Sequence, residues 1–167
     1  MDKLKEYLDK SFISAILCDY HYQFYNKINY ISMFPLVIGS SLLTILNSST
    51  IEESIMKYIN ISVNGLNTFV IALTTNYKLN DRLTTYKNLY IKYQKLSHKI
   101  ESCINKSTEL NERIIDDIIN EYDTLQNDNN FGYLSSYKKK IIDKYGKTHK
   151  MPNSLALDGD FVLTNAV

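Results

Sequence analysis

The side chains that could do chemistry are concentrated in an apolar part of the chain. Three amides, Asn60, Asn64 and Asn67, recur with Thr68 at three- and four-residue spacing inside a run without charges. Such spacing predicts that they share one side of a helix. In lipid their chemistry would be hydrogen bonding, either to a neighbouring helix or along a polar path through an oligomer. The sequence favours helix packing, and pore lining is the alternative.

Catalysis is not indicated by any motif. The sequence contains no glycine-rich phosphate loop, no HExxH and no GxSxG, and its histidines, His21, His98 and His149, lie in three separate contexts. Cys18 and Cys103 match neither a metal-binding pair nor a CxxC motif. We therefore expect a protein that is not an enzyme and that has no cofactor and no metal site.

The charge pattern argues against nucleic acid as a partner. The formal net charge is +1, and lysines alternate with acidic residues rather than forming a basic block. Such a chain lacks the electrostatic footprint of a nucleic-acid-binding protein.

Two uncharged runs predict an all-α membrane hairpin. Residues 28–51 form a run of 24 residues and residues 58–77 a run of 20. At ~1.5 Å per residue each reaches across a hydrocarbon core of ~30 Å. We expect transmembrane spans at about 28–48 and 58–77, joined by the short linker 52–57, with the lipid bilayer as partner.

Small side chains on the first span suggest how the two spans pack. Ser40, Thr44 and Ser48 repeat every four residues, which permits close approach of two helix backbones. We expect this stripe to face the asparagines of the second span.

Basic residues outside the two spans set the expected orientation. Lys27 precedes the first span and Lys78 and Arg82 follow the second, whereas the linker contains Lys57 alone. Cytosolic loops carry the excess of Lys and Arg. The chain is therefore expected to be an integral membrane protein with both termini in the cytosol.

The segments around the hairpin are also predicted to be helical. Residues 1–27 form an amphipathic entry helix, and residues 78–126 form a cytosolic helical hairpin or coiled coil whose first helix continues the second span. Residues 127–167 comprise a short basic helix from Ser135 or Ser136 to Gly146, followed by a tail that is either disordered or docked onto a partner.

A heptad pattern follows the second span. Heptads alone leave three pairings open: within the chain, with the helix around residues 110–125, or between chains. For an oligomer, we expect the seam to consist of Leu83, Tyr86, Tyr90, Tyr93 and Ile100.

The order of these parts, together with the segment DRLTTYKNLYIKYQKLSHKIE around Tyr86, Tyr90 and Leu96, resembles the SLATT family over residues 5–125. SLATT domains are two-transmembrane modules of nucleotide-signalling conflict systems. The resemblance implies an oligomeric effector that perturbs or perforates a bilayer, with the asparagine stripe facing the pore. No synthetase or sensor domain is recognised in these residues, so a trigger would come from a separate protein.

A second class of function fits the same layout. The abundance of Ile, Asn, Lys and Tyr and the small size suit a large DNA virus. The hairpin would then anchor a viral or membrane-scaffold protein, and residues 79–167 would bind a cytosolic or capsid protein. The two hypotheses differ on leakage, because a scaffold needs no polar path.

Overall fold

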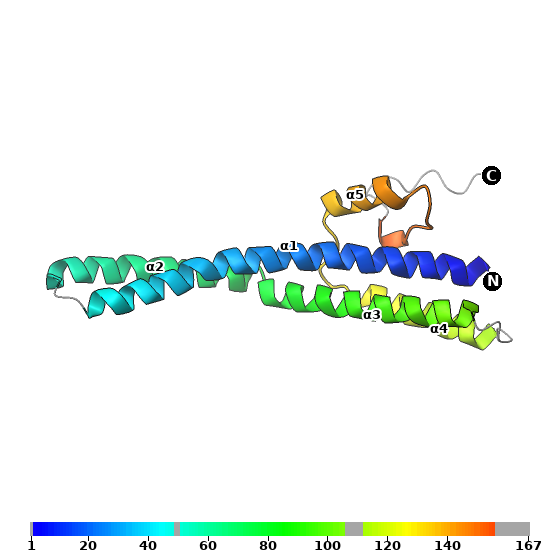
Figure 1. Cartoon of the computed structure of the whole chain (residues 1–167), viewed down its shortest axis with the longest axis horizontal. Helices are drawn as coiled ribbons and strands as arrows, with labels where there is room; N and C mark the ends of the chain where they lie inside the picture. Colours follow the sequence, from blue (N-terminus) through cyan, green and yellow to red (C-terminus); the bar gives the residue numbers. More distant parts are fainter. Residues whose placement is uncertain (1, 49–50, 106–111, 156–167) are drawn as a thin grey trace. The chain divides into compact units, whose positions relative to one another are not determined.

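A computed structural model describes residues 2–48, 51–105 and 112–155, and within these residues every regular element is a helix and there is no strand. The helices are α1 (Asp2–Asn47), α2 (Glu53–Asn76), α3 (Leu79–Asn105), α4 (Glu112–Asn127) and α5 (Ser135–Tyr145), followed by a 3₁₀ turn, Asn153–Leu155 (Figure 1). The expected all-α class is confirmed. The first residues of the helix expected around residues 110–125 lie outside the described residues.

The chain divides into two compact units. The first, here called the bundle unit, combines residues 1–22 with residues 84–167, and the second, the hairpin unit, consists of residues 23–83. Helices α1 and α3 each contribute to both units.

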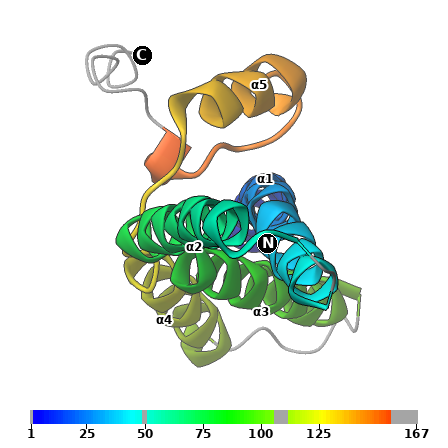
Figure 2. The ribbon, with the colours of Figure 1, turned by 90° about the vertical axis from the view of Figure 1, so that its left-hand side faces the viewer.

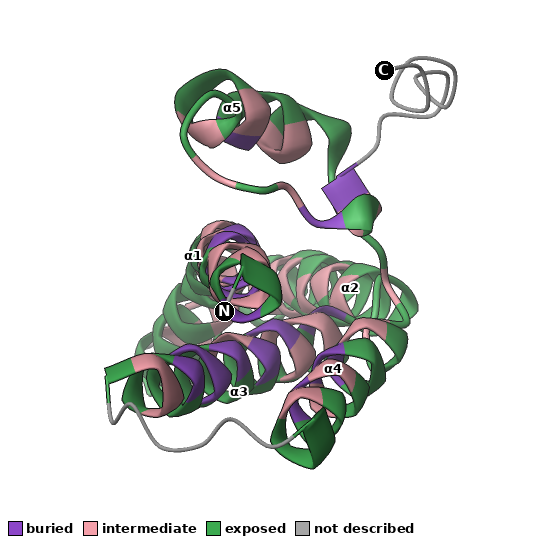
Figure 3. Ribbon diagram, turned by 90° about the vertical axis from the view of Figure 1, so that its right-hand side faces the viewer, coloured by how far each residue is buried: buried purple, intermediate pink, exposed green. Residues whose placement is uncertain are grey.

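The first six turns of α1 form the centre of the bundle unit. Figures 2 and 3 show α5 on one side of this helix and α3 on the other. Toward α5 and the 3₁₀ turn, Ile13 and Leu17 pack with Ile141 and Leu155, all at most 1% exposed. Because neighbours cover two sides of this segment, its buried face is wider than the one side predicted for an amphipathic entry helix.

The heptad pattern of α3 is used inside the chain. Tyr86, Tyr93 and Ile100 are at most 1% exposed, whereas Tyr90 and Leu83 are half-buried. The expectation that these five side chains form a seam between chains is therefore corrected for the three that are buried. The physical reason is that the aromatic rings of α1 and α4 already occupy this side of α3, as in the contact of Tyr93 with Tyr122.

Helix α4 packs on α3, as its apolar stripe predicted. Its buried residues are Ile118, Tyr122 and Leu125. At the rim of this contact Lys99 pairs with Glu121 at 2.6 Å. Such exposed pairs contribute at most about 1 kcal/mol, so apolar and aromatic burial stabilises the contact.

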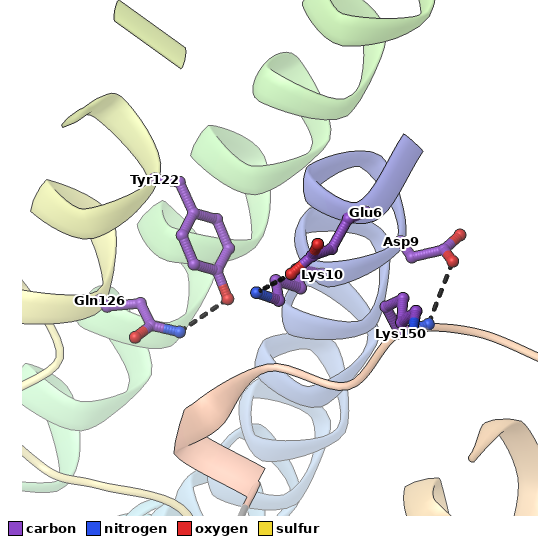
Figure 4. Close-up of polar contacts among 6 residues, drawn as sticks. All are labelled: Glu6, Asp9, Lys10, Tyr122, Gln126 and Lys150. Atoms are coloured by element: carbon purple, nitrogen blue, oxygen red, sulfur yellow. Dashed lines mark hydrogen bonds and ion pairs between the residues drawn. The ribbon is translucent and has the colours of Figure 1, made fainter. Parts of the chain in front are cut away.

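Part of the predicted tail docks on α1. After Gly146 ends α5, the backbone N–H of Lys150 donates to Asp9 at 3.0 Å (Figure 4), and Leu155 is 1% exposed. The sequence left open whether the tail is disordered or docked onto a partner. Residues 150–155 are docked, and they contact the chain's own first helix. The remaining tail residues, 156–167, lie outside the described residues.

A backbone break separates α2 from α3. Lys78 has φ of +48°, in the left-handed region, and α3 starts at the next residue. The expectation of one continuous helix from the second span into the heptads is wrong. A side chain with a Cβ adopts this conformation at a cost of about 1–2 kcal/mol, so no local residue preference signals the break.

Among the described helices, α1 is the one whose length and composition would allow it to cross a membrane. Helix α2 falls short of the same measure because asparagines and threonines dilute its apolar residues. The hairpin geometry of residues 23–83 is present, but a second span is not established by composition.

Candidate functional site

The α1–α2 hairpin is held by a continuous strip of half-buried side chains. On α2 the strip steps by three and four residues, and on α1 the same periodicity places Gly39 near its middle. The half-buried residues on α2 are Met56, Ile59, Asn60, Val63, Asn67, Val70 and Thr74, and those on α1 are Ile28, Asn29, Ser32, Pro35, Leu36, Gly39, Leu43 and Leu46.

The two helices approach each other closely at Gly39. A Cβ atom built on this residue would lie 2.9 Å from Cγ1 of Val63 and 3.1 Å from Oδ1 of Asn67. Both distances are shorter than ordinary van der Waals contact, so a side chain here would push the helices apart. Close approach across a small residue is the usual way in which membrane helices pair.

Asn67 is the predicted polar residue that lies deepest in this interface. Its Oδ1 is buried and has no hydrogen-bond partner among the described residues. A buried amide without a partner costs about 1–3 kcal/mol on protein mutational scales. Asn67 therefore directs an unsatisfied acceptor at the backbone of Gly39.

The other predicted asparagines and Thr68 do not share this position. Asn60 is half-buried on the side facing α1, whereas Asn64 and Thr68 are exposed. The Thr68 hydroxyl donates to the backbone carbonyl of Asn64 at 2.8 Å. The single stripe predicted from spacing is thus divided into an inner row, Asn60 and Asn67, and an outer flank, Asn64 and Thr68.

Ser40 and Thr44 do not face α2, and this expectation is corrected. Both are exposed, and their hydroxyls donate to the carbonyls of Leu36 and Ser40 in their own helix, at 2.8 Å and 2.9 Å. The helix turns so that Gly39, the smallest residue available, meets α2 instead. Their own-helix bonds satisfy both hydroxyls without a partner helix.

The outward surface of the hairpin is dominated by large apolar side chains. No residue of α2 is buried, and none of the apolar stretch of α1 is buried either. The exposed large side chains are Tyr30, Ile31, Met33, Phe34, Val37, Ile38, Leu42 and Ile45 on α1, and Ile55, Tyr58, Ile61, Leu66, Phe69, Ile71 and Leu73 on α2.

A crevice lies between α1, the end of α2 and the start of α3, at the end of the hairpin away from the 52–57 linker. It has a volume of about 490 Å³, and its wall contains Phe24, Tyr25, Tyr77 and Arg82. None of these was predicted as a site residue. Two sequence signals pointed at them: the tyrosines at the span ends and the basic residue after the second span.

A buried polar network in the bundle unit is centred on His21. Its Nδ1 lies 2.7 Å from the carbonyl oxygen of Leu17, and its Nε2 accepts the N–H of Leu134 at 2.8 Å. The rings of Tyr86 and Tyr133 lie 4.9 Å and 5.3 Å from the imidazole. Because both ring nitrogens are engaged with backbone groups, this histidine has a structural role.

Across the described parts of the chain, no three His, Cys, Asp or Glu side chains are gathered closely enough to hold a metal ion. Tyr93 is fully buried, and burial raises the pKa of its hydroxyl well above the usual range. Among the described residues, the Oη of Tyr93 has no hydrogen-bond partner of ordinary geometry. The nearby Ser14 hydroxyl partly opposes the increase in the pKa of Tyr93.

Comparison with known proteins gives no relative: no family model, no curated protein and no solved structure matches this chain. The function of this protein is therefore inferred from the geometry of the hairpin and from its surface chemistry.

Proposed function

We propose that the protein is an integral membrane protein in which α1 and α2 cross the bilayer as a hairpin, with both termini in the cytosol. The observation that carries the proposal is the apolar surface of the hairpin, where fifteen large apolar side chains from two helices are exposed. Monomeric soluble proteins rarely expose a contiguous apolar patch above a few hundred Å². Lipid is the solvent that suits such a surface.

The polar residues of α2 are compatible with this environment. Asn60, Asn67 and Thr74 lie on the side that faces α1. The hydroxyls of Thr68 and Thr74 donate to carbonyls of their own helix at 2.8 Å and 2.9 Å. These two hydroxyls would consequently remain satisfied in a hydrocarbon environment.

Within the membrane, we propose that the hairpin self-associates into an oligomer that perturbs or perforates the bilayer. Support comes from the outer flank, where the exposed amide of Asn64 lies one helical turn from Thr68. Lipid tails offer the amide no hydrogen bond, whereas the same flank on a second copy does. The inner row, Asn60 and Asn67, faces α1 and is assigned to helix packing.

Dye release from liposomes tests the effector activity. The purified chain is expected to release a trapped dye, and Asn64→Leu is expected to reduce the rate at least several-fold. Ser62→Leu is the matched control, because Ser62 is also exposed on α2 but lies outside the flank. Release that is unaffected by Asn64→Leu, or equally reduced by both variants, contradicts a role for the flank.

The alternative function is a viral or membrane-scaffold protein, and one feature of the bundle unit favours it. A groove of about 280 Å³ is lined by residues of α1 and α3, including Phe12 and Tyr90. Phe12 is 43% exposed, which suits a contact with a cytosolic or capsid protein. Insertion into liposomes as a monomer, without leakage at any protein-to-lipid ratio, would favour this alternative.

A further inference from the structure

The crevice at the open end of the hairpin combines an apolar wall with one fixed cation. Its volume of about 490 Å³ falls within the range of small-molecule sites, roughly 300–1,000 Å³. Apolar and aromatic side chains provide most of the wall, and Arg82 provides its charge. The lining residues are Phe24, Tyr25, Ile28, Ser32, Leu73, Thr74, Tyr77, Leu79 and Arg82.

Two hydrogen bonds hold the guanidinium of Arg82 at this wall. Its Nε donates to the carbonyl oxygen of Tyr77 at 3.1 Å, and its Nη1 donates to the hydroxyl of Tyr25 at 2.9 Å. Both acceptors are neutral oxygen atoms. An arginine whose planar fork is fixed in advance loses little side-chain entropy when it binds a phosphate.

The charges near this end of the hairpin also favour an anion. Lys27, Lys78 and Arg82 stand here against the single carboxylate of Asp81, whereas the linker at the other end has Glu52 and Glu53 with Lys57. Basic residues at the cytosolic ends of membrane helices attract anionic lipids.

We propose that this crevice binds one anionic phospholipid, with its phosphate against Arg82 and an acyl chain along Phe24, Ile28 and Leu73. An amphiphile fits better than a free anion because the wall that contains the charge is otherwise largely apolar. The proposal rests on the membrane insertion proposed above, and it adds a lipid class and a site to it.

The test uses tryptophan fluorescence, since the chain has no tryptophan of its own. Tyr77→Trp reports on the crevice, and Phe69→Trp reports on the outer surface of α2; the two native side chains are 67% and 60% exposed, so both replacements have room. The full chain is reconstituted in phosphatidylcholine bilayers with a small fraction of either brominated phosphatidylglycerol or brominated phosphatidylcholine, which quench nearby tryptophan.

For Tyr77→Trp, we expect the anionic quencher to be preferred about tenfold, which corresponds to ~1.4 kcal/mol. Adding Arg82→Gln should remove the preference, and Arg82→Lys should restore part of it. Lys57→Gln removes the same charge at the other end of the hairpin and should leave the preference unchanged. Equal quenching by the two lipids, or a preference that survives Arg82→Gln, overturns the proposal.

The Phe69→Trp variant distinguishes failure of the lipid-site proposal from failure of the proposed membrane insertion. Quenching of that tryptophan without any lipid preference at position 77 means that the hairpin is inserted but the crevice is not a lipid site. Absence of quenching at both positions contradicts insertion itself and both proposals with it. Native mass spectrometry of the unlabelled chain, with and without Arg82→Gln, provides a second measure through the number of phosphatidylglycerol molecules retained.

Discussion

At the scale of single residues, His21 connects the stability of the bundle unit to pH. Its Nε2 accepts a backbone N–H and its Nδ1 lies 2.7 Å from a carbonyl oxygen, so the ring is neutral with its proton on Nδ1. Burial lowers the pKa of this imidazole, and the bond to the carbonyl of Leu17 partly opposes that decrease. Protonation would break the bond from the N–H of Leu134.

The sign of the pH effect follows from linkage. The unfolded chain binds a proton near pH 6.5, the ordinary pKa of histidine, while the folded chain remains neutral to lower pH. The contribution to stability is therefore complete above about pH 6.5 and is lost as pH falls toward the lower pKa of the folded state. We expect a lower thermal midpoint at pH 5.5 than at pH 7.5, measured by near-ultraviolet circular dichroism of the tyrosines.

Two variants test this assignment. His21→Phe leaves the N–H of Leu134 without a partner, which should cost about 1–3 kcal/mol and flatten the pH dependence. His98→Gln is the control, because the side chain of His98 is 79% exposed and should not affect the slope. A pH dependence that persists in His21→Phe would assign it to other groups.

Cys18 is predicted to be chemically inert in the folded chain. Its thiol is fully buried 3.5 Å from the hydroxyl of Tyr133, and burial raises its pKa to about 12. Alkylation requires the thiolate, which is scarce at pH 8. With iodoacetamide we expect modification of the half-buried Cys103 alone in the native state and of both thiols after unfolding, as measured by peptide mass spectrometry. Native labelling of Cys18 at the rate of Cys103 would contradict this.

At the scale of helices, Gly39 is expected to set the separation of α1 and α2. Gly39→Leu would place side-chain atoms where Val63 and Asn67 already lie, at a cost of about 1–3 kcal/mol for overpacking. Gly65→Leu is the matched control, because no atom lies within 4 Å of a Cβ built there. Thermal unfolding in detergent micelles, followed by circular dichroism, should show a lower midpoint for Gly39→Leu alone.

The same helices show how far the sequence could predict the fold. The extent of α5 and its end at Gly146 followed from local signals, as did the burial of Tyr93 and Ile100 in a heptad pattern. The helix that packs against this heptad pattern could not be predicted, because a partner in the same chain and a partner in a second chain require the same spacing. The face of α2 was also ambiguous, because Asn60, Asn64 and Asn67 are spaced alike. The close approach at Gly39 decides which of these asparagines face α1. Because that contact involves two helices, the local sequence of α2 could not predict it.

At the scale of the whole molecule, the proposed topology makes a prediction that a single-span protein does not share. Composition alone identifies α1 as long and apolar enough to cross a membrane. If both α1 and α2 cross, the linker near Ser54 and the thiol of Cys103 lie on opposite sides of the bilayer. If α1 alone crosses, they lie on the same side, opposite the N-terminus.

Labelling with a thiol reagent that does not cross membranes distinguishes the two arrangements. Ser54→Cys introduces an exposed thiol in the first turn of α2, Cys103 serves as the native marker, and Cys18 is shielded by burial. In sealed vesicles of one orientation, we expect the reagent to reach one of the two thiols from outside and the other only after the membrane is opened. The basic residues around the spans predict that Cys103 reacts from the cytosolic side. Labelling of both positions from the same side would exclude the hairpin topology, and with it the position at the cytosolic surface on which the lipid site at Arg82 depends.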